Sequence, residues 1–341
     1  MTTINIQKLV RKNILELKPY ISFRDNNTFE NPLLMDANES PFGEFNRYPD
    51  STHKNLREKI SVSKNISAGQ IAIGNGSDEL IDLIIKIFCE PKKDSVVVMI
   101  PSFAMYGFYA AINENAIVQL NLNENFEIVK EDFLNAIKKD QPKVLFLCSP
   151  NNPTGNSIDD IEFYIQNFDG IVVVDEAYIE FSEQKSCLEL INKYPNLIVL
   201  QTFSKAWGLA GARIGIAYSS IEITNFIYTV KSPFNVNILS QNLVLEKLDQ
   251  IEDFQINLNK ILKEGDWLSN QLKNVECISK VFPTDANFFL LEFKEVEKVY
   301  STLLEHEILT SKRFPQIPSC IRINVGSRNE NQTLITILKS I

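Results

Sequence analysis

The segment GIVVVDE, residues 170–176, decides the fold class, because four consecutive apolar residues end abruptly at a carboxylate. Three other runs share this character: SVVVMI (95–100), KVLFLC (143–148) and NLIVLQT (196–202). Continuous rather than alternating apolar residues are typical of parallel strands covered on both faces. Helix-like stretches lie between them. The alternation predicts an α/β large domain over residues 41–245, a three-layer αβα sandwich with a mostly parallel sheet.

The clearest helix-like stretch is ELIDLIIKIFCE at 79–90, whose apolar residues recur with helical spacing. The C-terminal part differs, because the helical stripe VEKVYSTLLEH stands between the strand candidates NFFLLEF (287–293) and CIRINVG (320–326). This order predicts a smaller α+β domain over residues 246–341. We expect an N-terminal arm, residues 1–40, to join this small domain. A long helical stretch near 241–275 is expected to connect the two domains.

Composition excludes several classes of function. The chain has 341 residues, of which 44% are hydrophobic and 23% charged, and its net charge is −9. An acidic chain lacks the basic footprint of a nucleic-acid-binding protein. No segment approaches the roughly 20 apolar residues that span a bilayer, and the N-terminus lacks a signal-peptide pattern. We therefore expect no membrane partner and a cytoplasmic location.

The cysteines and histidines point away from disulfides and metals. Five cysteines are widely spaced without a C-x-x-C pair, as expected of structural thiols in a reducing compartment. The two histidines have no metal-like companions, so neither a zinc site nor a serine–histidine pair is expected.

IAIGNGSDELI, residues 71–81, places a glycine turn between a short apolar run and a helix. Free backbone N–H groups at a helix start bind anions, which makes Ser77, Asp78 and Glu79 candidates for a phosphate site. The dinucleotide pattern G-x-G-x-x-G is incomplete, because Glu79 occupies its third glycine position. An ordinary tight turn is the alternative.

TFSKAWGLAGARIG, residues 202–215, follows the apolar run at 197–200 and contains a single lysine, Lys205, beside Ser204. Arg213 follows eight residues later, and arginine can bind two phosphate oxygens at once. A lysine, a hydroxyl and an arginine suit a cofactor that carries an aldehyde and a phosphate, such as pyridoxal 5′-phosphate. A solvent-exposed surface lysine is the alternative reading of Lys205.

Three more loops follow predicted strands and carry candidate partners for such a ring. Asp175 ends a buried run, so it needs a cation or several donors, and a protonated pyridine nitrogen would serve. Tyr178 could donate to the ring's phenolate oxygen. Asn152 in CSPNNPTG (148–155) would stand at a strand's carboxyl end, where α/β sheets bind ligands. Tyr106 in PSFAMYGF offers a flat ring for stacking. Taken alone, these residues could equally be a helix cap, a turn and core packing.

The ordered set GNGSDE, PSFAMY, SPNNPTG, VVVDEAYIEF and TFSKAWGLAGARIG resembles the fold-type I pyridoxal-phosphate aminotransferases. LKPYISFR, LLMDANESP, NRYPD and CIRINVGSRNEN resemble the histidinol-phosphate aminotransferase branch of that family. The resemblance implies transfer of an amino group from L-histidinol phosphate to 2-oxoglutarate.

Carried over by position, the resemblance implies a covalent bond between Lys205 and the cofactor, whose pyridine nitrogen pairs with Asp175. It also implies a homodimer in which Tyr48 reaches the phosphate from the neighbouring subunit. Arg322 would bind the distal anion of the substrate, with Tyr20 and Arg24 nearby. The chain departs from the family at ILTSKRF, where Thr310 and Ser311 stand at a position that often carries arginine. Lys312 or Arg313 could compensate.

Alternative functions remain at this stage. An aromatic amino-acid aminotransferase would keep every cofactor residue and differ only in its substrate pocket. A decarboxylase of a phosphate-bearing substrate and a non-catalytic regulator that binds the cofactor are further options. The regulator is disfavoured by the acidic charge and by the absence of a spare helix-turn-helix segment.

Overall fold

The computed structural model describes residues 4–25, 27, 29 and 31–341. Its larger sheet, within these residues, has seven strands in the order β1-β7-β6-β5-β4-β2-β3. The strands are β1 (Ile71–Asn75), β2 (Ser95–Ile100), β3 (Ala116–Asn121), β4 (Val144–Cys148), β5 (Ile171–Asp175), β6 (Leu197–Thr202) and β7 (Ile214–Ser219). Strands β2 to β6 pair in parallel, and β7 runs antiparallel to β1 and β6. The predicted α/β class with a mostly parallel sheet is confirmed.

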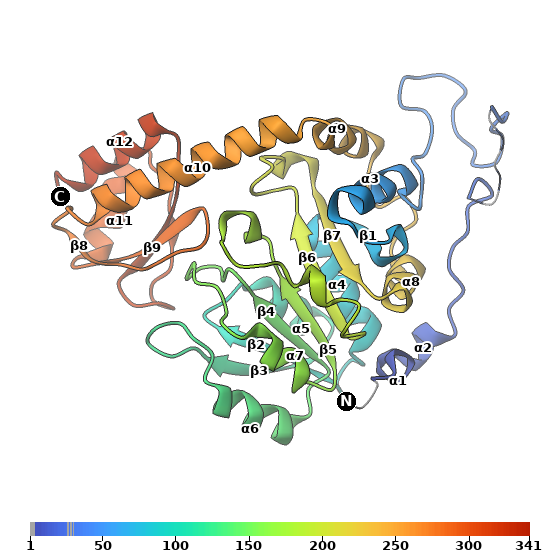
Figure 1. Cartoon of the computed structure of the whole chain (residues 1–341), viewed down its shortest axis with the longest axis horizontal. Helices are drawn as coiled ribbons and strands as arrows, with labels where there is room; N and C mark the ends of the chain where they lie inside the picture. Colours follow the sequence, from blue (N-terminus) through green and yellow to red (C-terminus); the bar gives the residue numbers. More distant parts are fainter. Residues whose placement is uncertain (1–3, 26, 28, 30) are drawn as a thin grey trace.

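Helices cover both faces of this sheet (Figure 1). One face packs against α4 (Gly76–Phe88), α5 (Met105–Ile112) and α8 (Ile221–Val230). The opposite face packs against α3 (Lys54–Lys64), α6 (Lys130–Asp140), α7 (Ile161–Gln166) and α9 (Ile238–Leu248). Burial of apolar strand residues on both sides is the reason why the sequence shows continuous apolar runs.

A second, antiparallel sheet follows the large one. Its order is β10-β11-β9-β8, with β8 (Ile278–Val281), β9 (Phe288–Phe293), β10 (Ser311–Lys312) and β11 (Cys320–Asn324). The helices α10 (Ile251–Leu272), α11 (Val296–Glu305) and α12 (Arg328–Leu338) share a core with one face of this sheet. The division of the chain at residue 246 stays a prediction.

The connection between the sheets differs in detail from the expectation. Instead of one helical stretch over 241–275, α9 ends at Leu248 and α10 begins at Ile251. The polar residues Asp249 and Gln250 occupy the break. Figure 1 shows α10 running from α9, beside the large sheet, to the second sheet.

The described N-terminal residues correct one expectation. The sequence predicts that residues 1–40 join the small domain, but α1 (Ile6–Leu9) and α2 (Lys12–Leu15) pack on the large sheet's side (Figure 1). Ile6, Val10 and Ile14 are buried in the core that contains α4. The Arg11 guanidinium also donates to the Lys86 carbonyl over 2.9 Å. Residues 1–3, 26, 28 and 30 of the predicted arm lie outside the described residues.

In the part of the chain that the structure describes, no helix combines the length and apolar character needed to cross a membrane.

The arrangement of the strands defines where a ligand can bind. The carboxyl ends of β2, β4, β5 and β6 meet at one edge of the large sheet, because these strands are parallel.

Candidate active site

A cavity lies at that edge of the sheet. The sequence-predicted residues that line it are Ser77, Asp78, Asn152, Asp175, Tyr178, Ser204, Lys205 and Arg213. They come from the start of α4 and from the loops after β4, β5 and β6. Sequence reasoning missed four lining residues, Phe103, Cys148, Ala177 and Thr202. Each of them lies within four residues of a predicted site residue, in the same loop or at the end of the strand before it.

The start of α4 provides an anion site at one end of the cavity. The helix begins at Gly76, whose φ of +78° favours glycine, and a Cβ there would lie 2.5 Å from Arg213 Nη2. A Cβ at Gly215 would lie 2.3 Å from the backbone nitrogen of Ser77. These two glycines let β7 and the Arg213 guanidinium approach the first turn of the helix. Its backbone N–H groups therefore face the same space as a cation.

Arg213 itself is held in a left-handed backbone conformation, with φ of 55°. Its guanidinium lies 3.5 Å from both the Ser204 hydroxyl and an Asp78 carboxylate oxygen. Left-handed backbone is unfavourable for a residue with a side chain, by about 1–2 kcal/mol. This conformation places a guanidinium and a hydroxyl beside the helix start, as a phosphate site requires.

Glu79 lies outside the cavity lining. Its carboxylate accepts hydrogen bonds from the backbone N–H of Asn75 at 2.5 Å and from Asn235 Nδ2 at 2.7 Å. The side chain thus caps the start of α4. Only its backbone N–H is left as a candidate for anion binding.

Asp175 is deeply buried at the cavity, because only 3% of it is exposed. Its carboxylate accepts from the Tyr106 hydroxyl over 2.7 Å and from the Ala177 backbone N–H over 3.1 Å. Burial raises its pKa, whereas Tyr106 and the Ala177 N–H lower it. Within the described residues Asp175 forms no ion pair with a lysine or arginine. A ligand cation at this point would therefore complete the site.

The position of Tyr106 corrects the predicted stacking role. The Tyr106 side chain is fully buried below the cavity, with its hydroxyl on Asp175 and its ring stacked on Phe146 at 4.7 Å. Phe103 lines the cavity instead and meets the Tyr106 ring edge-on at 5.5 Å. Helix α5 begins at Met105, so Tyr106 turns into the core while Phe103 stays in the preceding loop.

Lys205 is exposed in the cavity, and its Nζ lies 5.6 Å from the centre of the Tyr178 ring. Partial desolvation lowers the pKa of the ammonium, and the charge of Arg322 lowers it further. Asp175 and Asp78 act in the opposite direction. A lysine with a lowered pKa and an accessible Nζ can act as a nucleophile and as a base.

Arg322 links the second sheet to the cavity. Its Nη1 donates to Asn152 Oδ1, and Asn152 Nδ2 lies 3.4 Å from the Tyr178 hydroxyl. The guanidinium carbon lies 5.1 Å from the centre of the Phe288 ring. The Nε atom is buried without a hydrogen-bond partner among the described residues. Arg322 therefore retains unused donors next to the cavity.

The remaining predicted residues, Tyr20 and Arg24 in the arm and Tyr48 shortly after it, are absent from the cavity lining. Tyr48 is 52% exposed and stacks on Phe234 at 4.5 Å, and Tyr20 meets the same ring edge-on at 6.3 Å.

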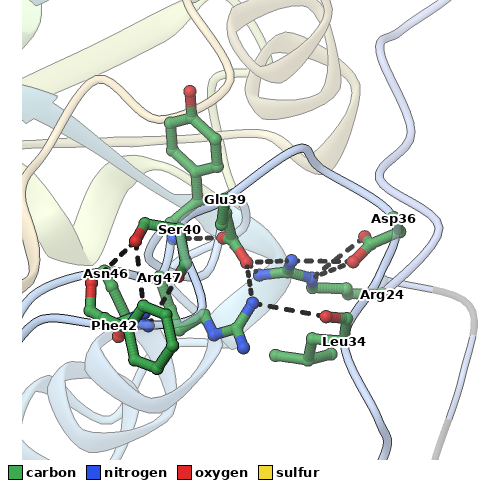
Figure 2. Close-up of polar contacts among 9 residues, drawn as sticks. Arg24, Leu34, Asp36, Glu39, Ser40, Phe42, Asn46 and Arg47 are labelled. Carbon is green, nitrogen blue, oxygen red and sulfur yellow. Dashed lines mark hydrogen bonds and ion pairs between the residues drawn. The ribbon is translucent and has the colours of Figure 1, made fainter.

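Figure 2 shows where Arg24 lies: its guanidinium points to two carboxylates of the arm, Asp36 and Glu39. Glu39 also accepts from Arg47 over 2.8 Å and from the Tyr48 backbone N–H over 2.6 Å. The Arg24 hydrogen bonds lower the pKa of Glu39 to about 2. Within one chain, Arg24 is thus engaged by two carboxylates and lies outside the cavity lining, and its contact with a substrate anion stays a prediction.

Comparison with known proteins identifies the family of this chain. The sequence model of the family "Aminotransferase class I and II" matches residues 23–338. Proteins named histidinol-phosphate aminotransferase match nearly the whole chain. The protein from Cytophaga hutchinsonii is 41% identical over 98% of this chain and 99% of its own length. The protein from Christiangramia forsetii is 42% identical over 100% of this chain and 99% of its own.

Solved structures show the same fold. The histidinol-phosphate aminotransferase from Clostridium acetobutylicum has a TM-score of 0.80 and 26% identity, covering 87% of this chain and 90% of that one. The enzyme from Sinorhizobium meliloti, solved in complex with pyridoxal-5′-phosphate, has a TM-score of 0.80 and 22% identity, covering 89% of each chain.

Proposed function

The chain belongs to the class I and II aminotransferases, and on that premise we propose that it transfers the amino group of L-histidinol phosphate to 2-oxoglutarate. The products are imidazole-acetol phosphate and glutamate, a step of histidine biosynthesis. One observation carries the proposal. A nucleophilic lysine, a buried carboxylate that lacks a cation and a helix-start anion site line a single cavity.

The cavity fits pyridoxal 5′-phosphate, because each charged part of the cofactor meets a group of opposite character. Asp175 would hold the protonated ring nitrogen, and Asn152 with Tyr178 would hold the phenolate oxygen. The backbone of Ser77, Asp78 and Glu79, with Ser204 and Arg213, would hold the phosphate. Phe103 is the ring that we assign to stacking in place of Tyr106. Pyridoxal phosphate supplies an electron sink and an aldehyde carbon that carries the amino group.

Lys205 has two tasks in this proposal. Its Nζ would hold the cofactor through the aldehyde carbon until the substrate amine takes its place, and the freed amine would then accept the proton from the substrate Cα. The lowered pKa leaves a larger unprotonated fraction at neutral pH than a free lysine would have. Positioned proton transfer of this kind accelerates a reaction about 10²–10⁴-fold.

Arg322 would bind the distal anion of both substrates. A phosphate monoester is present in one half-reaction and a carboxylate in the other, and a guanidinium pairs bidentately with either. The buried Nε without a partner supports this role, since a bound anion would satisfy it.

The partners of this chain would be small-molecule substrates and a second copy of itself. We propose a cytoplasmic homodimer in which Tyr48 of one subunit reaches the phosphate in the other. The segment at the end of the arm supports it, because three of its large apolar side chains face solvent: Leu33 is 86%, Met35 85% and, just after the arm, Phe42 84% exposed. Such a concentration of exposed apolar side chains is typical of an interface.

The test is a spectrum followed by steady-state rates. The purified protein with bound cofactor should absorb near the visible edge, and this band should collapse on mixing with L-histidinol phosphate. The rate with L-histidinol phosphate should exceed the rate with phenylalanine. A preference for phenylalanine would favour the aromatic amino-acid aminotransferase, and a band that no amine alters would favour a non-catalytic protein.

A further inference from the structure

We propose that Arg313 is a second anion-binding guanidinium that acts beside Arg322 and selects amino donors carrying a phosphate. The inference rests on the proposed function, because it assigns a specificity-determining residue to that reaction. It concerns the place where the chain departs from its family, at Thr310 and Ser311.

The pairing of two strands puts Arg313 and Arg322 on the same face of the second sheet. In the antiparallel register of β10 and β11, Ser311 lies opposite Arg322, and Lys312 opposite Ile321. The ladder continues one residue further, because the Arg313 backbone N–H donates to the Cys320 carbonyl over 3.2 Å. Opposite residues share a face and alternate residues return to it. Arg313, Ser311 and Arg322 therefore project from one face.

Lys312 projects from the other face of the sheet. Of the two candidates, Lys312 and Arg313, only Arg313 therefore shares a face with Arg322. Its Nζ lies 4.4 Å from the centre of the Phe314 ring and 5.7 Å from that of Tyr300 in α11. The ammonium is thus occupied by aromatic rings away from Arg322. Thr310 and Ser311 carry no charge, so Arg313 is the cation that this segment presents beside Arg322.

Ser311 fixes the direction of the Arg313 side chain. The Ser311 hydroxyl oxygen accepts from Arg313 Nε over 3.1 Å and also from Nη2. The remaining N–H groups of the fork have no partner in the described part of the chain. Two hydrogen bonds to one hydroxyl hold the planar guanidinium in place before a ligand arrives, which lowers the entropic cost of binding.

The charges of the two guanidiniums are not compensated within the described residues. Neither Arg313 nor Arg322 forms an ion pair with a carboxylate. Burial lowers the pKa of both groups, and the charge of Arg322 lowers the pKa of Arg313 further. Both charges also lower the pKa of Tyr178, which lines the cofactor cavity and whose pKa is raised overall by burial. Two half-buried like charges on one face of the second sheet, without a carboxylate partner, favour the binding of an anion.

A phosphate monoester meets that demand better than a carboxylate. At pH 7 it carries a charge of about −1.5 to −2 and three acceptor oxygens. Arg322 and Arg313 together offer two positive charges, whereas the distal carboxylate of 2-oxoglutarate needs only one. Arg322 would therefore serve both substrates, and Arg313 would favour the phosphorylated amine.

The experiment compares Arg313→Gln with a matched control, Lys312→Gln, in the enzyme with bound cofactor. Both variants remove one positive charge, from adjacent residues on opposite faces. Arg313→Gln should raise the KM for L-histidinol phosphate about tenfold to hundredfold, as expected for a lost charge-assisted contact. The KM for the acceptor should change by about twofold or less, and Lys312→Gln should leave both constants within about twofold, since exposed charges are screened. Inorganic phosphate should weaken as a competitive inhibitor of the Arg313 variant in parallel.

Three results would overturn the inference: an unchanged KM for L-histidinol phosphate in Arg313→Gln, an equal rise for both substrates, or an equal effect of Lys312→Gln. Should Arg313→Gln fail to retain cofactor absorbance, Arg313→Lys provides the same comparison with a smaller rise of about threefold or more, because an ammonium lacks the planar fork. A wild-type enzyme inactive with every amine would instead refute the proposed transamination. Normal wild-type activity with an indifferent Arg313 variant refutes this inference alone.

Discussion

Replacing Asp175 with asparagine should have opposite effects on the protein with and without its cofactor. The substitution keeps the shape of the side chain: the asparagine oxygen can accept from the Ala177 N–H, which bonds to Oδ1 of Asp175, and the amide nitrogen can donate to the Tyr106 hydroxyl oxygen, which lies at Oδ2. It removes the negative charge that would pair with the ring nitrogen. The stability of the cofactor-free protein therefore measures the free energy lost by burying the charge of Asp175. The affinity for the cofactor measures what that charge contributes to binding.

In the cofactor-free protein the charge of Asp175 is unfavourable. Burial raises its pKa above the unfolded value, so the folded state binds the proton more tightly than the unfolded state. As the pH rises past the unfolded pKa of about 3.9, the folded carboxylate becomes progressively destabilising. At neutral pH, Asp175→Asn should therefore relieve about 1–2 kcal/mol. The melting temperature of the cofactor-free protein should rise by about 2 °C for each kcal/mol.

In the cofactor-bound protein the loss of a charged hydrogen-bonded partner should dominate. Such contacts are worth about 1.5–3 kcal/mol, so the Kd of pyridoxal phosphate should rise about tenfold to hundredfold. An absorbance titration measures this affinity, and scanning calorimetry with and without cofactor measures the two stabilities. The matched control is Tyr106→Phe, which removes the 2.7 Å donor and keeps the charge. It should destabilise the cofactor-free protein by about 1–2 kcal/mol, the opposite sign to Asp175→Asn.

The reasoning fails if Asp175→Asn binds the cofactor as tightly as the wild type. It also fails if the substitution lowers the stability of the cofactor-free protein as much as that of the bound form. The first result would mean that no cation lies against position 175, and the second that the buried charge is already compensated.

Two further substitutions probe other parts of the account. Arg322→Lys should raise the KM of donor and acceptor alike, by about tenfold each, since an ammonium binds neither anion bidentately. Steady-state kinetics with each substrate varied in turn measures the two KM values. A rise in only one of them would contradict a shared anion pocket. Glu39→Gln should make the arm more sensitive to protease at pH 7 but not near pH 2. The pKa of Glu39 is lowered by Arg24, so its stabilising effect is present above about pH 4.5 and is lost as the pH falls through about 2; equal cleavage of wild type and variant at pH 7 would contradict it.

Four buried strands of the large sheet were predictable from their continuous apolar runs, whereas β7, which is also buried along its length, was not predicted. The runs at 95–100, 143–148, 170–176 and 196–202 correspond to β2, β4, β5 and β6 within one residue at each end. The helical stripe at 79–90 likewise corresponds to most of α4. Strand β3 was not predicted. It lies at the exposed edge of the sheet, and its sequence mixes polar and apolar residues without a clear periodic pattern.

The parts that sequence reasoning placed wrongly depend on the direction of single side chains. Phe103 and Tyr106 are three residues apart, and only the start of α5 between them determines which ring reaches the cavity. The contacts of Arg24 with Asp36 and Glu39 were also not predicted, because these partners lie 12 and 15 residues away in an irregular segment. No periodicity predicts a contact of that kind. Arg313 and Lys312 could be separated only by the register of β10 and β11.

The central claim is that the Nζ of Lys205 forms the covalent bond to the cofactor, and reduction by borohydride tests it most directly. After incubation with pyridoxal phosphate, reduction and digestion, mass spectrometry should find the stable adduct on the peptide that contains Lys205 and on no other lysine. A colourless protein without a labelled peptide, or a label spread over surface lysines, would contradict the account.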